Sequence, residues 1–200
     1  MSALSELNKE IAHCQRCEIA KHRIKAVPGE GPEDAEIMFI GEAPGWHEDQ
    51  QGRPFVGPAG QFLDQLLASI GLKREHVYIT NVIKTRPPGN RDPLPIEIRN
   101  CEEWLERQIE IICPKMIVSL GRYSMAKFFP GKSISKIHGT AQKRDNIIYY
   151  AMYHPAAALH QQSLRQAIEA DMRKIPALLA EAKSMPETEP EPQQLSMFED

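Results

Sequence analysis

Hydrophobic residues in this chain fall into short apolar runs separated by longer segments with helical periodicity. Four such runs predict buried strands at residues 36–40, 77–80, 116–120 and 147–153. Apolar residues spaced three and four apart predict helices at 4–14, 62–70, 95–112, 124–129 and 163–180, the last with a kink at Pro176. Strands that alternate with helices indicate a mainly parallel sheet covered on both faces. The expected fold is a three-layer α/β/α domain with a central four-stranded sheet.

The composition changes after residue 182. Residues 184–192 contain three prolines and three glutamates and offer too little apolar surface to build a core, which predicts a disordered linker at 183–193. The peptide that follows, Gln194-Leu195-Ser196-Met197-Phe198, carries three large apolar side chains. The chain thus divides into a domain at 1–182, an acidic linker and a short terminal peptide.

Length and charge narrow the class of protein. A chain of 200 residues fits one domain plus a tail, and it has neither an 18-residue apolar run nor a secretory signal, so we expect a cytoplasmic protein without a membrane segment. Residues 183–200 hold one lysine and five acidic residues, a net of −4, so residues 1–182 carry +1 of the total −3. Bulk charge therefore does not indicate nucleic-acid binding.

Chemically useful side chains follow the predicted strands. The first strand leads into Gly41-Glu42-Ala43-Pro44-Gly45, the second ends at Asn81, and the fourth ends at His154. Ligands of open parallel sheets bind outside the carboxyl ends of the strands. A carboxylate, an amide and an imidazole are therefore expected to converge on one site, an arrangement that favours an enzyme able to hold a pyrimidine base.

Several motifs resemble those of the family 4 uracil-DNA glycosylases. The first motif comprises residues 41–45, 48–49, 52–57 and 59–60, and the later ones are residues 80–82, 86–91 and 154–157, in the same order as in the family. This resemblance implies the uracil-DNA glycosylase fold. It also implies an enzyme that hydrolyses the N-glycosidic bond of deoxyuridine in DNA, releasing uracil and leaving an abasic site.

The resemblance also implies roles for individual residues. Glu42 would position or activate the attacking water, and His154 would donate a hydrogen bond to uracil O2 and favour the anionic leaving group. Phe55 would stack on the base, Asn81 would bind its N3–H and O4 edge, and Glu48 would crowd a thymine methyl group. The remaining substrate-binding positions are Gly41 and Ala43. The expected DNA-binding residues are Arg86, Asn90, Arg91, Ala156 and Leu159, with Leu159 as a wedge in the vacated base stack.

The cysteines depart from the family pattern at one position. Cys14 and Cys17 have metal-ligand spacing, and the family adds two later cysteines to hold a [4Fe-4S] cluster. Cys101 matches one of these, whereas Thr85 occupies the other position. Cys113 lies ~18 Å from Cys101 along one helix, too far for a shared cluster, and is expected to begin the buried third strand. Three outcomes stay open: a cluster with an oxygen or external fourth ligand, a labile or [3Fe-4S] cluster, or no cluster.

The terminal peptide Gln194–Phe198 resembles the segment by which bacterial repair and replication proteins bind the sliding clamp. It predicts the clamp as a partner of a monomeric enzyme, tethered through the linker. An alternative function is a uracil-DNA binding or trapping protein without turnover, although residues 86–95 lack the histidine of the trapping branch. A nucleotide hydrolase is disfavoured, because the loop after the first strand has no Gly-Lys-Ser/Thr sequence and Glu42 would repel phosphate.

Overall fold

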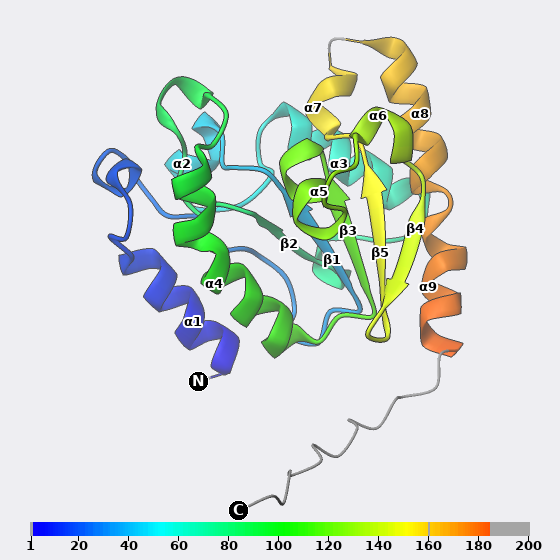
Figure 1. The fold of residues 1–200 in the computed structure, drawn as a ribbon, viewed down its shortest axis with the longest axis horizontal. Coiled ribbons are helices and arrows are strands. Elements are labelled where there is room, and N and C mark those ends of the chain that lie inside the picture. The colour runs from blue at the N-terminus through cyan, green and yellow to red at the C-terminus, as the bar shows by residue number, and fades with distance from the viewer. Residues whose placement is uncertain (1, 160, 185–200) are drawn as a thin grey trace, which may run out of the picture.

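A five-stranded sheet forms the centre of the molecule in the computed structural model, which describes residues 2–159 and 161–184. The strand order is β2-β1-β3-β5-β4 (Figure 1). The parallel strands are β1 (Ile37–Gly41), β2 (Tyr78–Asn81), β3 (Met116–Leu120) and β5 (Ile147–Met152). The mainly parallel α/β architecture predicted from the apolar runs is confirmed. The sheet has one strand more than the four expected.

The additional strand is β4 (Ala141–Arg144), which pairs antiparallel with β5 at the sheet edge. All four of its residues are exposed, so the segment has neither an apolar run nor the alternation that marks a half-buried strand. Asp145 and Asn146 connect β4 to β5 with φ angles of 48° and 62°. Two left-handed residues of this kind form the tight turn that suits the twist of a hairpin, which makes Asp-Asn the local signal for β4.

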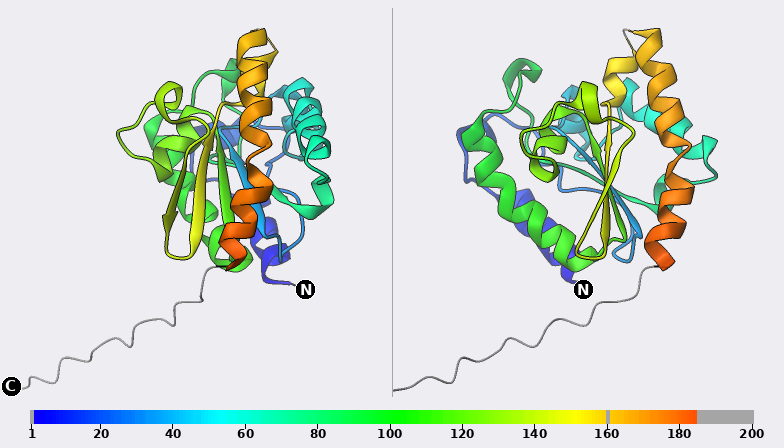
Figure 2. Two further views of the ribbon diagram at one scale, coloured as in Figure 1. Left: turned by 90° about the vertical axis from the view of Figure 1, so that its right-hand side faces the viewer. Right: turned by 45° about the vertical axis from the view of Figure 1, so that its right-hand side comes forward.

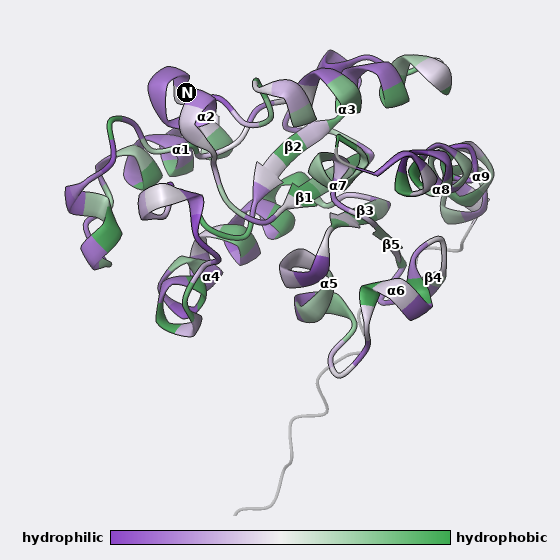
Figure 3. Ribbon diagram, turned by 90° about the horizontal axis from the view of Figure 1, so that it is seen from above, coloured by the Kyte–Doolittle hydropathy of each residue, from purple (hydrophilic) through white to green (hydrophobic). Residues whose placement is uncertain are grey.

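Helices cover both faces of the sheet (Figures 2 and 3). One face packs against α3 (Pro58–Ser69), α7 (Pro155–Ala158), α8 (Gln162–Met172) and α9 (Ile175–Ser184). The other face packs against α1 (Ala3–His13), α4 (Pro95–Ile112), α5 (Arg122–Phe128) and α6 (Ile134–Ile137). Successive residues of β1 alternate between the two cores, with Phe39 in the first and Ile40 in the second, and both are fully buried. This double burial explains the unbroken apolar runs of the parallel strands.

Two helical segments differ from the sequence expectation. The predicted helix at 163–180 is divided into α8 and α9, which continue one another as a column beside the sheet (Figure 2). Pro176 is the second residue of α9, where its missing N–H breaks no helical hydrogen bond, so it starts a helix and does not kink one. A short helix, α2 (Trp46–Gln51), lies between the strand predicted at 36–40 and the helix predicted at 62–70, where no helix was predicted.

The C-terminal features lie almost entirely beyond the part of the chain that the structure describes. Helix α9 extends to Ser184, so the first two residues of the expected linker at 183–193 continue the helix. The peptide at 194–198 is outside the described residues. Within the described ranges no helix is long and apolar enough to span a membrane.

Candidate active site

A cavity of about 370 Å³ opens at the carboxyl ends of β1 and β2. It brings together nine of the predicted residues: Glu42, Ala43, Glu48, Phe55, Asn81, Asn90, Arg91, His154 and, from the start of α7, Ala156. Pro44, Gly45, Ala59 and Pro87 complete its lining. The convergence expected from the strand ends is therefore present, since β1, β2 and β5 each deliver their terminal polar group to one space.

Gly41 makes the close approach of the pocket side chains possible. It is the register partner of Asn81 on the neighbouring strand. A Cβ atom on Gly41 would lie 2.4 Å from Asn81 Oδ1 and 2.5 Å from Phe55 Cζ, both far inside van der Waals contact. Gly41 thus contributes to the site by having no side chain.

The aromatic ring of Phe55 forms one wall of the cavity. Phe55 is buried, and its ring is stacked on that of His154 with a centroid distance of 5.5 Å and an interplanar angle of 26°. Its φ of 50° is left-handed, a conformation that a residue with a bulky side chain adopts rarely. The surrounding structure therefore holds Phe55 in place.

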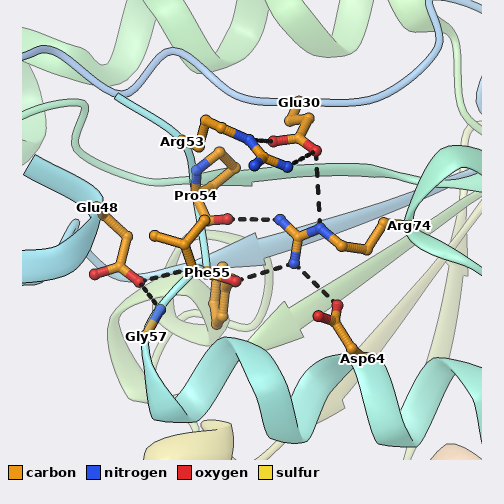
Figure 4. Close-up of polar contacts among 9 residues, drawn as sticks. Glu30, Glu48, Arg53, Pro54, Phe55, Gly57, Asp64 and Arg74 are labelled. Atoms are coloured by element: carbon orange, nitrogen blue, oxygen red, sulfur yellow. Dashed lines mark hydrogen bonds and ion pairs between the residues drawn. The ribbon is translucent and has the colours of Figure 1, made fainter. Parts of the chain in front are cut away.

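Glu48 fixes the loop that carries Phe55. One carboxylate oxygen accepts hydrogen bonds from the backbone N–H groups of Val56 and Gly57, both at 2.9 Å (Figure 4). The other accepts one from Gly45 N–H at 3.1 Å. Glu48 lines the cavity as expected, but these three hydrogen bonds of its carboxylate go to the loop backbone. Its position accounts for the shape of the loop from Gly45 to Gly57.

Asn81 presents an unsatisfied acceptor to the cavity. The residue is 1% exposed, and its Oδ1 has no hydrogen-bond partner among the described residues. An unpaired buried amide oxygen costs about 1–3 kcal/mol, which a ligand N–H can recover. The backbone carbonyl of Asn81 accepts a 2.8 Å hydrogen bond from the ammonium of the fully buried Lys84, which also donates to Thr80 Oγ1 and Gln108 Oε1 at 2.7 Å. Motif reading did not identify Lys84.

His154 is held as a neutral donor. Burial lowers the pKa of His154 to about 4, against the opposing effect of the Glu48 carboxylate. Its Nδ1 accepts a hydrogen bond from the Ala156 N–H at 3.1 Å, because His154 caps the N-terminus of α7. In the neutral ring the proton is therefore on Nε2, the nitrogen free to donate to a ligand.

Glu42 has the protonation behaviour of a general base. Burial and, to a smaller extent, the Asp92 carboxylate raise the pKa of Glu42 to about 7, against the opposing effect of the Arg122 guanidinium. Arg122 and Asp92 form an ion pair beside it, between the N-terminus of α5 and the loop before α4. A carboxylate with this pKa accepts a proton efficiently near neutral pH.

The expected DNA-binding residues surround the mouth of the cavity unevenly. Arg91 lines it and is held by Glu97 at 2.6 Å, and Asn90 accepts a 2.6 Å hydrogen bond from Arg86. Arg86 itself lies outside the lining and borders a neighbouring hollow with His22 and Asp49. Leu159 also lies outside the lining, at the end of α7, and its side chain is 45% exposed.

Comparison with known proteins identifies this arrangement. The sequence profile described as the uracil DNA glycosylase superfamily matches residues 28–175. The Type-4 uracil-DNA glycosylase of Sulfurisphaera tokodaii is 48% identical over 185 residues, which cover 88% of this chain and 84% of that protein. The enzyme of the same name from Archaeoglobus fulgidus is 46% identical over 184 residues, 88% of this chain and 92% of that protein. The chain belongs to the uracil-DNA glycosylase superfamily. The resemblance to its family 4 members is confirmed.

The three cysteines that match the family 4 pattern gather on the face of the sheet covered by α1 and α4. Buried Cys101 on α4 belongs to the core cluster against which the half-buried Cys14 and Cys17 pack. Burial raises the pKa of the Cys101 thiol, and the nearby Cys17 and Cys14 thiols raise it further. The three are therefore neighbours, although no three potential ligands within the described ranges are placed to hold a single metal ion.

Each of the three sulfurs faces an N–H group. Trp104 Nε1–H donates to Cys14 Sγ at 3.4 Å, and the backbone N–H groups of Ala20 and Lys84 face the sulfurs of Cys17 and Cys101. Hydrogen bonds of this type stabilise thiolate ligands and tune iron-sulfur clusters. The donor set fits the family's cluster at three of its four positions.

Neither Thr85 nor Cys113 supplies a fourth cysteine ligand beside Cys14, Cys17 and Cys101. Thr85 is buried, and its hydroxyl accepts a 3.1 Å hydrogen bond from Arg23, which also donates to the carbonyl of Ala12. Cys113 is exposed at the C-terminal end of α4 with a φ of 47°, not part of a buried strand as expected. The α4 helix separates Cys113 from Cys101, as the helical spacing predicted.

Replacing Gly41 by alanine tests the role of the missing side chain. We expect the G41A enzyme to lose about 10- to 100-fold in kcat/KM on uracil-containing DNA, because the new methyl group displaces Asn81 and Phe55. The control is G131A, whose Cβ meets open space and whose φ of 73° makes the substitution strained for backbone reasons alone. We expect G131A to lower the melting temperature and to leave kcat/KM unchanged. Equal effects of the two substitutions on kcat/KM would contradict the assignment.

Proposed function

We propose that the protein hydrolyses the N-glycosidic bond of deoxyuridine in DNA, releases uracil and leaves an abasic site. The observation that carries this proposal is the buried, unpaired Oδ1 of Asn81, which lines one cavity with the ring of Phe55 and the neutral imidazole of His154. Only a base turned out of the helix reaches such a cavity, and its extrusion costs a few kcal/mol that pocket contacts repay.

Asn81 supports selection of uracil over cytosine. Its Oδ1 accepts from the N3–H of uracil, and its amide N–H donates to O4. Cytosine has an acceptor at N3 and a donor at N4, so it would place acceptor against acceptor and leave the buried groups unpaired. A site built on buried hydrogen-bonding groups rejects the wrong pattern strongly for that reason. Stacking on Phe55 then holds the plane of the base.

His154 and Glu42 support the chemical step by stabilising opposite charges, His154 the negative charge on uracil and Glu42 the positive charge on the deoxyribose. As the glycosidic bond breaks, negative charge grows on uracil and positive charge on the deoxyribose. The Nε2–H of His154 donates to uracil O2 and stabilises the anion. Glu42, mostly ionised above neutral pH, orients a water toward C1′, accepts its proton and offsets the charge on the sugar.

The residues around the cavity support binding of the DNA backbone. Arg86, Asn90 and Arg91 lie in one loop beside the mouth, where their cationic and amide groups suit phosphate oxygens. The exposed side chain of Leu159 suits insertion into the stack that the base vacates. Glu48 lines the cavity while its carboxylate braces the loop, which supports the proposal that it crowds the 5-methyl group of thymine.

The alternative function is a uracil-DNA binder that does not turn over. To test it, the protein is incubated with a large molar excess of an oligonucleotide that contains one uracil, and the DNA is then treated with alkali. We expect strand cleavage to exceed the amount of enzyme many times, since Glu42 has the pKa of a base that acts near pH 7. A protein–DNA adduct that stops at one strand per protein, and that alkali does not cleave because C1′ stays bonded to the protein, would establish the trapping protein. A folded protein that gives neither cleavage nor an adduct would exclude both the glycosylase and the covalent trap.

The pH dependence of kcat/KM tests Glu42. The ionised form is active, so we expect kcat/KM to rise with pH through an apparent pKa of about 7 and to level above it. No second limb is expected between pH 5 and 9 from His154, which burial keeps neutral above its pKa of about 4. The E42Q enzyme should lose about 100- to 10,000-fold in kcat and should lose the limb at pH 7. A limb that persists in E42Q would assign it to another group.

We also propose that Cys14, Cys17 and Cys101 hold an iron-sulfur cluster with Thr85 at the fourth position. Such a group supplies a structural link between the N-terminal segment and the loop after β2, since glycosidic hydrolysis transfers no electrons. The N–H groups that face the three sulfurs support the proposal.

Anaerobically purified protein should be brown and contain iron and sulfide. The C101A variant should lose the colour and the iron, because it removes a buried ligand, whereas C113A should keep both, since Cys113 is exposed at the far end of α4. Iron analysis and visible absorption measure the difference, and T85C should raise the iron content. Equal iron in C101A and the unaltered protein would exclude this cysteine set.

For the partners, we propose a monomer that binds a bacterial sliding clamp through Gln194–Phe198 in the cytoplasm. The support is the peptide sequence after an acidic Pro/Glu segment, and free cysteines in the described part of the chain that suit a reducing compartment. Loss of clamp binding on removal of residues 194–198 tests it.

A further inference from the structure

We propose that Arg74, which lies outside the cavity, is a positioning residue that fixes Phe55 and so sets the stacking wall of the base pocket. Arg74 begins a 3₁₀ helix (Arg74–His76) before β2, 19 residues from Phe55 in the sequence. It belongs to none of the motifs that mark the family in this chain. The inference rests on the proposed function for its effect on catalysis, and on geometry alone for its effect on Phe55.

The guanidinium of Arg74 donates hydrogen bonds to two backbone carbonyls of the Phe55 turn (residues 54–57). Nη2 donates to the carbonyl of Pro54 at 2.6 Å, and Nη1 donates to the carbonyl of Phe55 at 3.0 Å (Figure 4). The side chain is 19% exposed, so these hydrogen bonds are largely shielded from water. Charge-assisted bonds of this kind are roughly twice as strong as neutral ones.

The Phe55 turn needs such a grip because its conformation is unfavourable by itself. Phe55 has a φ of 50°, and its carbonyl passes so close to Gly60 that a Cβ there would lie 1.8 Å from the oxygen. A bulky residue persists in this region only where the surroundings over-determine it. Arg74 holds the carbonyls of residues 54 and 55, and Glu48 holds the N–H groups of residues 56 and 57. The turn is thus clamped by a cation and an anion.

Arg74 is itself held in a single orientation. Nη1 donates to Asp64 Oδ1 on α3 at 3.1 Å, and Nε lies 3.8 Å from Glu30 Oε1. Glu30 accepts two hydrogen bonds of 2.8 Å from Arg53, which fix its carboxylate in turn. A planar guanidinium satisfies several acceptors at fixed angles, which a lysine ammonium does not do. Arg74 therefore links the segment before β1, the Phe55 turn and α3.

The test is a double-mutant cycle with R74M, F55L and the combined variant, with R53M as the matched control. Arg53 shares Glu30 with Arg74, but its guanidinium donates to the Glu30 carboxylate and not to the backbone of the Phe55 turn. We expect R74M to lower kcat/KM on uracil-containing DNA by about 10- to 100-fold and R74K to recover little of it. Since Arg74 acts through Phe55, R74M should add less than about threefold to the loss in F55L. R53M should stay within about twofold of the unaltered enzyme.

A spectroscopic signature separates positioning from general destabilisation. The ring of Phe55 stacks on His154, so its ring current shifts the His154 proton resonances, and R74M should remove this shift at a temperature where melting curves show the protein folded. R53M should preserve it. Unchanged His154 resonances in R74M, or effects of R74M and F55L that multiply fully, would overturn the inference. If the unaltered protein shows no turnover, the proposed function fails, and the resonances still decide the role of Arg74.

Discussion

The arrangement of the whole pocket depends on the absence of a side chain at Gly41. Parallel pairing sets Gly41 beside Asn81, and the missing side chain lets the amide oxygen and the Phe55 ring approach to distances that a methyl group forbids. The left-handed backbone of Phe55 and the close contact between its carbonyl and Gly60 allow the Phe55 ring to come this near to Gly41. Arg74 and Glu48 are then required because a strained turn does not hold itself. The packing around Gly41 thus depends on the guanidinium of Arg74, which lies 33 residues further along the chain.

Burial affects the two reactive side chains in opposite directions. It disfavours charge on both, so it raises the pKa of Glu42 to about 7 and lowers that of His154 to about 4. At pH 7.5 to 8 the carboxylate is mostly ionised while the imidazole is neutral. In the reaction we propose, the charge would therefore already be on the side where the sugar becomes cationic, and a neutral donor would face the departing anion. One physical cause, exclusion of water, would then suit each residue to its proposed role.

The parts of the structure that the sequence predicted are those governed by local pattern. Strands β1, β2, β3 and β5 are buried on both faces, so each is an apolar run, and the residues after their carboxyl ends necessarily meet. Strand β4 has four exposed residues and no such pattern. Arg74 and Lys84 act on the pocket through backbone carbonyls, which any residue supplies, so no motif marks them. Their roles depend on tertiary distance, as does the raised pKa of Glu42.

The attachment of the N-terminal helix does not rest on the cysteines alone. Leu4, Leu7 and Ile11 of α1 are buried in one core cluster with Trp104 and Leu105 of α4. Arg107 pairs with Glu10 at 2.7 Å, and Arg16 pairs with Glu103 at 2.5 Å. Arg23 joins the Ala12 carbonyl to the Thr85 hydroxyl, so a hydrogen bond connects the segment after α1 to the very position where the family has a cysteine. Because these contacts require no metal, the exchange of that cysteine for threonine is compatible with an intact fold, and its effect should be concentrated on the cluster.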